Sequence, residues 1–257
     1  KAVVLGASSF GIQVAESLAK QNIKTHVIEP GSHILHNQFP QEFINIITPV
    51  YRKMGVHFLL EDAPQHIGGT DGKTSYLETQ KHTRFDAQAV ITTIAQPHRS
   101  VDIKVRRRKG YVVDKYMKTS HSSIWAAGGC VELFDQYHNQ SRSWQQWDIA
   151  YRMGWIAGAN MSGRRQSFAQ PVTVHHHVLD GKPAYAMGQL EGEDSIEDIN
   201  RMKQQYQRFV FDGRTLIGAC WYGVDLDPFV MQQIIGQQKE VTPDNTILDP
   251  TYPWHLV

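Results

Sequence analysis

The chain has 257 residues, enough for one large α/β domain or for two smaller domains that each have their own core. Hydrophobic residues make up 41% of it and charged residues 20%, which is typical of soluble globular proteins and argues against the disordered and membrane-spanning classes. Because 26 Lys and Arg face 25 Asp and Glu, the formal net charge of +1 provides no global field to gather nucleic acid or an acidic membrane surface.

The number and spacing of the cysteines indicate the redox state of the compartment in which the protein works. Cys130 and Cys220 lie far apart in the sequence, so neither a disulfide framework nor a CxxC redox or zinc motif can be written from this chain. This usage suits a reducing compartment, and a cytoplasmic location is expected. No apolar run reaches the roughly 18 residues of a membrane helix, and no signal peptide stands at Lys1.

The first 30 residues predict a βαβ unit. Residues 2–5 form an apolar run that ends at Gly6, as in a strand buried on both faces of a parallel sheet. Helical spacing of apolar residues follows until "KQN", and "KTHVIEP" predicts a second strand that stops at Pro30. After that, "QEFINIITPVYRKMGV" has a helical pattern that we expect to break near Pro49, and "VHFLLED" predicts another strand.

In the middle of the chain the pattern changes from alternating strands and helices to short strands. "SYLETQKHTRFDAQAVITTIA" predicts short antiparallel strands that return to a buried strand at 89–95. In the block 98–165, short strands precede an apolar segment that ends in Gly128 and Gly129, and "SWQQWDIAYRMGWIAGANMSG" predicts a helix. From Pro171 onward, two hairpins turn at Asp-Gly pairs, a helix follows in "DPFVMQQIIGQQ", and the proline-punctuated tail reads as an extended arm.

The turn after the first strand is a candidate diphosphate site. Gly6, Ser8 and Gly11 occupy the three positions of G-x-G-x-x-G, with serine in place of the second glycine. The first position permits a tight turn, the second lets the backbone approach a pyrophosphate, and the third lets the helix pack close to the strand. Ser9 and Phe10 complete this candidate cofactor-binding turn. The alternative is a βαβ unit whose small residues serve only tight packing.

Glu29 strengthens the nucleotide interpretation. It ends the second predicted strand, where an acid bonds the two hydroxyls of an adenine ribose. A carboxylate there also repels a 2′-phosphate, and no Arg follows within several residues, so NADH is expected in preference to NADPH. His33 and His36 follow, either at the adenosine end of the ligand or simply in solvent.

Three stretches resemble the flavin-dependent pyridine nucleotide-disulfide oxidoreductases, particularly their rubredoxin reductase and nitrite reductase-like branch. They are "VVLGASSFGIQVAESLAKQNIKTHVIEPGSHIL", "GYVVDKYMKTSHSSIWAAGGCVE" with the Trp-bearing helix after it, and "YQRFVFDGRTLIGACWYG". The resemblance implies an α/β fold in three parts: a Rossmann-like NAD(P)H-binding lobe at 1–97 with a βαβ unit and an antiparallel meander, the returning part of an FAD-binding domain at 98–165, and a small α+β interface domain at 166–257. Since the family's FAD lobe begins with a glycine fingerprint upstream, we expect the chain to be a fragment of a longer protein.

The resemblance also implies cofactor contacts, with three departures. Gly128 and Gly129 stand where the family has Gly-Asp, whose carboxylate serves the flavin side. Gln13 stands in place of a Glu near the nicotinamide, and Ala95 in place of a glycine after the lobe's last strand. Trp147 begins the helix that, by resemblance, approaches the flavin, although a role in helix packing is an open alternative.

The implied activity is hydride transfer from NADH to FAD and electron delivery to an acceptor such as a redox protein. No catalytic side chain of this chain is implied. The family's redox cysteines, where present, belong to the N-terminal lobe, so Cys130 and Cys220 are expected to serve packing. FAD binding is implied only together with the N-terminal lobe, and a homo-oligomer or association with a chain that carries that lobe is the expected assembly. The alternative is a non-catalytic relative that acts as a structural or partner-docking module.

Two further clusters have ordinary explanations. His175–His177 places two imidazoles on one strand face, but no third ligand is near in sequence, so polar strand residues at an interface are favoured over a metal site. The basic run Lys104–Gly110 is favoured as a solvated loop or hairpin tip over a phosphate-binding element, because no aromatic platform is interleaved with it.

Overall fold

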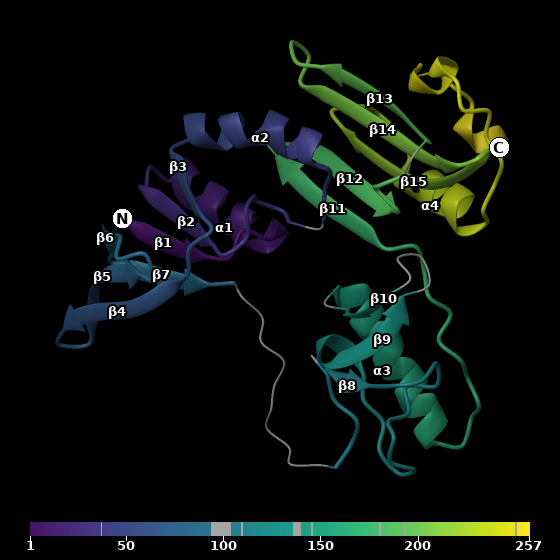
Figure 1. Cartoon of the computed structure of the whole chain (residues 1–257), viewed down its shortest axis with the longest axis horizontal. Helices are drawn as coiled ribbons and strands as arrows, with labels where there is room; N and C mark the ends of the chain where they lie inside the picture. The colour runs from purple at the N-terminus through teal and green to yellow at the C-terminus, as the bar shows by residue number, and fades with distance from the viewer. Residues whose placement is uncertain are drawn as a thin grey trace. The chain divides into compact units, whose positions relative to one another are not determined.

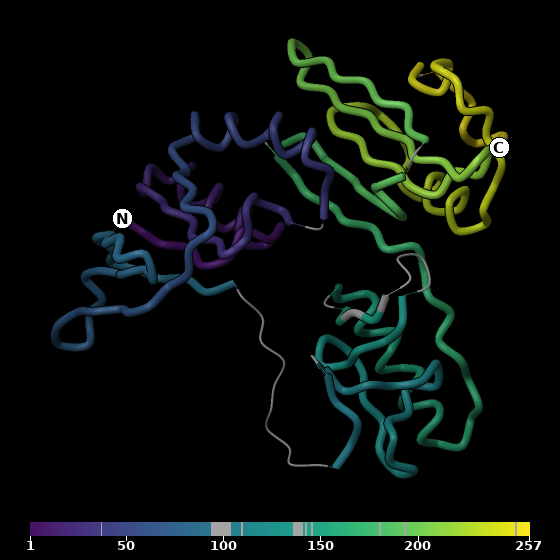
Figure 2. The backbone as a smooth tube through the Cα atoms, viewed as in Figure 1, coloured from purple at the N-terminus to yellow at the C-terminus, as the bar shows by residue number. Residues whose placement is uncertain are grey.

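The structure is a computed structural model that describes residues 1–36, 38–93, 104–108, 110–135, 140–144, 146–179, 181–192, 194–249 and 251–257. The chain forms two compact units. Unit 1 joins Lys1–Ile94 to Thr173–Val257, and unit 2 is Ala95–Val172, so the chain leaves unit 1 and later returns to it (Figure 2). The predicted boundaries after residues 97 and 165 stay predictions.

A four-stranded parallel sheet begins unit 1, with strand order β3-β2-β1-β7. Helix α1 (Ser9–Lys20) connects β1 to β2, so the expected βαβ unit is present (Figure 1). The α/β class with a parallel sheet and antiparallel sheets is confirmed. The strands are β1 (Ala2–Leu5), β2 (Thr25–Glu29), β3 (Val56–Leu60) and β7 (Ala89–Thr92).

Alternate side chains of this sheet enter two different cores, as the two-residue period of a strand requires. Val4 and Val27 join the cluster formed with α1 and with α2 (Gln41–Lys53). Val3 and Ile28 point the other way and pack with Leu77 and Ala87. That second face is covered by an antiparallel meander of β4 (Pro64–Thr70), β5 (Lys73–Thr79) and β6 (Arg84–Asp86).

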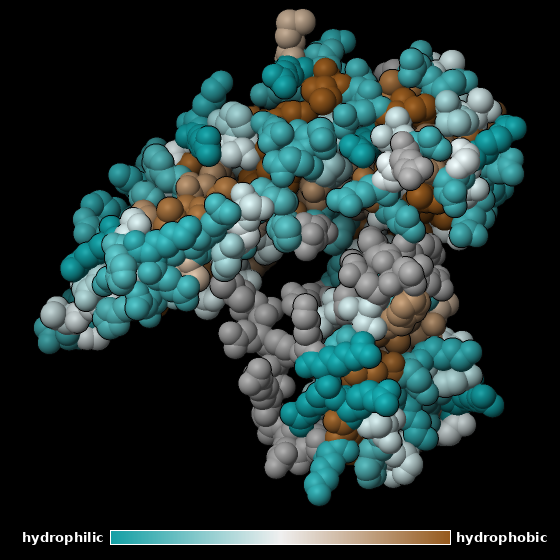
Figure 3. Space-filling model, in the orientation of Figure 1, coloured by the Kyte–Doolittle hydropathy of each residue, from teal (hydrophilic) through white to brown (hydrophobic). Residues whose placement is uncertain are grey.

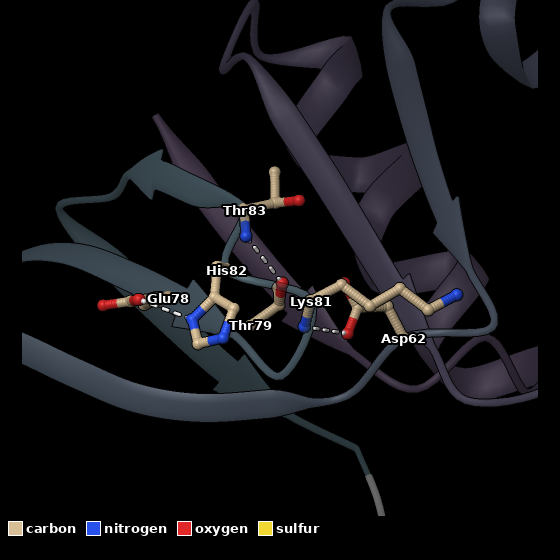
Figure 4. Close-up of polar contacts among 6 residues, drawn as sticks. All are labelled: Asp62, Glu78, Thr79, Lys81, His82 and Thr83. Carbon is tan, nitrogen blue, oxygen red and sulfur yellow. Dashed lines mark hydrogen bonds and ion pairs between the residues drawn. The ribbon is translucent and has the colours of Figure 1, made fainter.

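Asp62 ties the end of β3 to the turn between β5 and β6 (Figure 4). Its Oδ1 accepts hydrogen bonds from the N–H of Ala63 at 2.8 Å and of Lys81 at 3.3 Å. Thr79 Oγ1 accepts a further bond from the N–H of Thr83 at 3.1 Å. Burial alone would raise the pKa of Asp62, but the hydrogen bonds from Thr79 and from the two N–H groups lower it overall. The ionised carboxylate of Asp62 thereby holds the turn of the meander against the end of β3.

A five-stranded antiparallel sheet completes unit 1, in the order β11-β12-β15-β14-β13. Both predicted hairpins are present in it, whereas β13 was not predicted. The sheet lies beside α2 (Figure 1), and Tyr206 and Tyr222 share one core with Phe43 of that helix. The strands are β11 (Val174–Leu179), β12 (Lys182–Gly188), β13 (Asp194–Asn200), β14 (Gln205–Asp212) and β15 (Thr215–Tyr222).

The C-terminal segment packs on this sheet, which corrects the expected extended arm. Helix α4 (Pro228–Gly236) is capped by Asp227, and two short 3-10 turns follow, η2 (Asn245–Leu248) and η3 (Trp254–Leu256). Trp254 is buried with its ring centroid 5.0 Å from that of Phe209 in β14, and Figure 2 shows the segment (yellow) beside the sheet. Burial of this large aromatic ring stabilises the packed segment, and such a tertiary contact cannot be predicted from composition.

Unit 2 places a small sheet against one helix. Its strand order is β10-β9-β8, and β8 and β9 are parallel. The core of the unit joins Val131 and Trp144 to Ile149 and Met153 of the helix. The elements are β8 (Tyr111–Val112), η1 (Gly128–Cys130), β9 (Val131–Asp135), β10 (Gln140–Ser143) and α3 (Trp147–Met161).

Pro49 does not break the second helix, contrary to the sequence expectation. Helix α2 continues through it to Lys53. Pro49 lies on the exposed side, and so does Asn45, whose carbonyl loses its helical partner and can bond water instead. The opposite side buries Phe43, Ile47 and Tyr51 completely. Burial of these three side chains offsets the cost of an internal proline, which is about 3 kcal/mol.

Candidate functional site

The glycine turn after β1 has the geometry that its motif requires. Gly6 has a φ of 100°, in the region that favours glycine. A Cβ added at Gly11 would lie 2.0 Å from the Gly6 carbonyl oxygen and 2.8 Å from Thr93 Oγ1, so the third position admits only glycine without rearrangement. The tight turn and the close approach of helix and strand therefore both exist, as a diphosphate site of this type needs.

The backbone donors of this turn face oxygen acceptors that belong to the protein. The Ala7 N–H donates to Glu29 Oε2 at 2.7 Å. The Ser9 N–H, at the first position of α1, donates to Gln38 Oε1 at 3.0 Å, and the Ser9 hydroxyl donates to the same oxygen at 3.2 Å. A carboxylate thus accepts one donor of the turn, and an amide carbonyl accepts the N–H at the first position of α1.

Glu29 lies at the tip of β2, where the sequence placed it, and its side chain is half-buried. Besides Ala7, its carboxylate accepts the N–H of Gly31 at 2.8 Å through Oε1. Its role toward a ribose stays a prediction. Gln38 was missed by the sequence reasoning, because it lies 29 residues from Ser9 and no local pattern connects the two.

The loop after β2 brings His33 and His36 together. His33 Nε2 and His36 Nδ1 are 3.1 Å apart, and His33 Nδ1 is 3.0 Å from Ser32 Oγ. Burial and the neighbouring His36 lower the pKa of His33, although Glu29 opposes this shift. A neutral, hydrogen-bonded imidazole therefore lies close to Glu29.

The remaining predicted residues of the turn lie at its surface. Ser8 is half-buried and extended, and its hydroxyl makes no capping bond to the helix. Phe10 is 64% exposed, and Gln13 is exposed on the next turn of α1. These side chains are accessible from solvent, and nothing in the structure assigns them a contact with a cofactor. Ala95 lies outside the described residues.

The glycine pair of unit 2 forms η1 directly before β9. Gly128 has a φ of 80°, and Gly129 is exposed. Glu132, the next acid along the chain, is buried and faces the N–H of Gly110 at 3.4 Å and Arg108 Nη1 at 3.7 Å. It therefore does not replace the carboxylate that the family places at Gly129. The described residues of unit 2 offer a backbone turn but no carboxylate there, so they do not by themselves make an FAD site.

Trp147 is the most exposed of the large side chains on α3, so it does not belong to the described core of unit 2. It is 80% exposed, and its ring stacks on that of Tyr151 with centroids 5.7 Å apart. Trp155 continues this exposed side of the helix, while Ile149 and Met153 fill the buried side. Trp144, by contrast, is fully buried. Trp147, Tyr151 and Trp155 thus form an exposed aromatic stripe on α3 that the described residues of unit 2 leave open to solvent.

The histidine run and the cysteines have structural surroundings. His177 is fully buried, and its Nε2 makes a hydrogen bond with the Tyr51 hydroxyl of α2. Burial raises the pKa of the Cys220 thiol well above its ordinary value, so this residue is an unreactive packing group. Cys130 Sγ donates to the Ala127 carbonyl at 3.3 Å. In the described ranges, no three His, Cys, Asp or Glu side chains gather in a way that could hold a metal ion.

A parallel sheet, a glycine turn that leads into a helix and an acid at the neighbouring strand tip are the features of an FAD/NAD-binding fold. A sequence profile described as pyridine nucleotide-disulphide oxidoreductase matches residues 1–154, more than half of the chain. The chain therefore belongs to the pyridine nucleotide-disulphide oxidoreductase family, as the sequence resemblance predicted.

Similar proteins are longer than this chain. Nitrite reductase [NAD(P)H] of Bacillus subtilis (strain 168) is 20% identical over 254 residues, which are 96% of this chain and 31% of that protein. The structure of putidaredoxin reductase in a covalent complex with putidaredoxin superposes with a TM-score of 0.82 at 19% identity, over 99% of this chain and 62% of the reductase. The structure of the water-forming NADH oxidase of Lactobacillus brevis, bound to NADH, superposes with a TM-score of 0.77 at 18% identity. The match covers 93% of this chain and 58% of the oxidase. The chain thus spans from 31% to 62% of the length of these relatives.

Proposed function

We propose that this chain is the NADH-binding and interface portion of a flavin-dependent oxidoreductase, which passes hydride from NADH to FAD and electrons onward to an acceptor. The observation that carries the proposal is the pair of turn donors, Ala7 N–H and Ser9 N–H, held by oxygen acceptors at the head of α1. Backbone N–H groups that bind a carboxylate and an amide oxygen here are also able to bind diphosphate oxygens. NADH binding by the Lactobacillus brevis relative supports the same ligand class.

The residues of this chain would bind and orient the nucleotide. The Ser9 N–H and hydroxyl would turn from Gln38 to a phosphate, and Glu29 would bond the ribose hydroxyls and disfavour a 2′-phosphate. FAD would supply the hydride acceptor, and its site would need residues beyond those of this chain. The exposed aromatic stripe of α3 supports association with such a lobe or with another partner, because large exposed aromatic clusters mark interfaces.

Binding of NADH to the purified chain tests the proposal, with isothermal titration calorimetry as the measurement. We expect NADH to bind more tightly than NADPH. The Glu29→Gln variant should weaken NADH binding by about tenfold or more, because hydrogen bonds to a charged group contribute about 1.5–3 kcal/mol. Glu61→Gln, which changes an exposed glutamate just after β3, is the matched control and should leave the affinity unchanged.

The second candidate is a non-catalytic family member that serves as a structural or docking module. Gly129 favours it, because the carboxylate expected at the flavin side is missing. Failure of the wild-type chain to bind NADH, with a colourless preparation even after FAD is added, would leave this candidate alone. Equal affinity of wild type and Glu29→Gln would instead show that the ribose contact is assigned wrongly.

A further inference from the structure

The two units carry opposite charges that the near-zero total conceals. Unit 2, residues 95–172, contains 12 Lys and Arg but 5 Asp and Glu, a formal charge of 12 − 5 = +7. The remaining 14 Lys and Arg and 20 Asp and Glu lie in unit 1 and give 14 − 20 = −6. The two charges nearly cancel over the whole chain, but each unit has an electrostatic field of its own. Such a field acts over about 10 Å at 0.1 M salt and farther in more dilute salt.

The cationic surface of unit 2 is defined by six exposed side chains: Arg106, Arg107, Lys115, Arg152, Arg164 and Arg165. Figure 3 shows hydrophilic side chains projecting over much of the visible face of this unit, around a smaller apolar area. The acids described in unit 2 differ in exposure: Asp148 is exposed four residues before Arg152 on α3, and Glu132 pairs with Arg108. Glu132 and Asp135 are buried, and Asp114 accepts the N–H groups of Tyr116 and Lys118 at 2.8 and 3.0 Å.

Several of these cations rest on aromatic rings. The Arg107 guanidinium lies 4.8 Å from the Tyr111 ring centroid, and the Tyr116 ring has Arg165 at 5.2 Å and Lys115 at 5.5 Å. A cation held over a ring is partly ordered before a partner arrives, so less side-chain entropy is lost on binding. These contacts partly preorganise the cationic side chains of the surface.

We propose that the cationic surface of unit 2 docks a protein with an acidic face, which would be the electron acceptor of the proposed reaction; the inference rests on that proposed function. Putidaredoxin reductase, a similar structure, was solved in a complex with a protein, putidaredoxin. The negative charge of unit 1 would repel an acidic partner and direct it to unit 2. Nucleic acid is disfavoured, because Tyr111 and Tyr116 are covered by cations and so are not bare platforms for stacked bases.

The test uses labelled poly-L-glutamate as the probe of an acidic polypeptide, with fluorescence anisotropy at low salt. The reversed variant combines Arg106→Glu, Arg107→Glu, Arg164→Glu and Arg165→Glu. The control variant reverses four exposed lysines of unit 1, at Lys24, Lys53, Lys73 and Lys239, and so changes the net charge equally. We expect the reversed variant to lose at least about tenfold in affinity and the control variant to lose much less, since binding depends on local charge.

Three results would overturn the proposal. They are equal loss of poly-L-glutamate binding in the two variants, tighter binding of duplex DNA than of poly-L-glutamate at the same salt, and tighter binding of phosphatidylserine vesicles. Circular dichroism of each variant checks that it is folded, and the salt dependence of wild-type binding gives a readout that needs no variant. NADH titration of the same proteins separates this proposal from the proposed function, because loss of the cationic surface should leave nucleotide affinity unchanged.

Discussion

The glycine turn after β1 and the glycine pair before β9 both depart from the family pattern, but the consequences differ. At the first, Ser8 replaces a glycine, yet the proposed nucleotide site depends on the backbone N–H groups of Ala7 and Ser9, which the replacement leaves in place. At the second, Gly129 replaces an aspartate whose function resides in its side chain. A position that acts through the backbone tolerates a small replacement, whereas one that acts through a carboxylate does not.

The largest effect should come from filling the first turn. Gly11→Ala would place a Cβ 2.0 Å from the Gly6 carbonyl oxygen, a backbone atom that cannot move without moving β1. We expect the free energy of unfolding to fall by about 3 kcal/mol or more, at the upper end for overpacking of a tight core. Urea titration followed by far-UV circular dichroism measures the loss.

The control for this substitution is Gly154→Ala on α3, where an added Cβ meets nothing within 4 Å. Because alanine is the better helix former, this variant should gain about 0.5–1 kcal/mol in the free energy of unfolding. A Gly11→Ala protein as stable as the Gly154→Ala protein would mean that the close packing of α1 on β1 is not needed.

Much of unit 1 could be predicted from the sequence, because its signals are local. The apolar run of β1, the helical spacing of α1 and the Asp-Gly turns of the C-terminal hairpins each lie within a few residues of the structure that they specify. Strand β13 was not predicted, because its exposed, acid-rich sequence has no alternation of apolar and polar residues. Its pairing along β14 alone gives it a strand conformation.

The details of the candidate site could not be predicted in the same way, because they depend on contacts between distant residues. Gln38 reaches Ser9 across 29 positions, and His177 reaches Tyr51 across 126. The continuation of α2 through Pro49 likewise depends on a core that the sequence pattern does not display. In each case tertiary packing decides which of several locally allowed conformations is adopted.

Acid sensitivity should distinguish the two units. Burial lowers the pKa of His177 to about 4, with a smaller contribution from His176, and burial also lowers the pKa of His26 to about 4. Both residues lie in unit 1. Between pH 6.5 and 4 the unfolded chain binds protons that the folded chain does not, so the free energy of unfolding falls as the pH is lowered through this window. Below the folded pKa the loss is complete.

For His177 the full loss is roughly 3 kcal/mol, given about 1.4 kcal/mol for each unit of pKa difference. Urea titrations at a series of pH values measure it. His177→Gln should flatten the pH dependence, leaving the part due to His26, whereas His176→Gln, at an exposed position, should barely alter it. A pH dependence that survives His177→Gln in full would remove His177 as its cause.

The glycine pair of unit 2 should be less sensitive than the glycine turn. A Cβ at Gly128 would lie 3.6 Å from Ala150 Cβ, an ordinary contact, so only the φ of 80° opposes a side chain there. We therefore expect Gly128→Ala to lower the free energy of unfolding by about 1–2 kcal/mol, the cost of the left-handed conformation. The urea titration used for Gly11→Ala compares the two sites, and a greater loss at Gly128 would reverse their ranking.

The smallest expected effect concerns Gln38, whose side chain holds the Ser9 donors that the proposal assigns to a phosphate. Gln38→Ala frees the Ser9 N–H and hydroxyl, so NADH would no longer have to displace a bond that contributes about 0.5–1 kcal/mol. The affinity should rise about two- to fivefold by calorimetry. Gln41→Ala, which alters a bond to Asn45 on α2, is the control and should have no effect. A fall in affinity would instead mean that Gln38 holds the turn in its binding conformation, and its contact with Ser9 would then be part of the site.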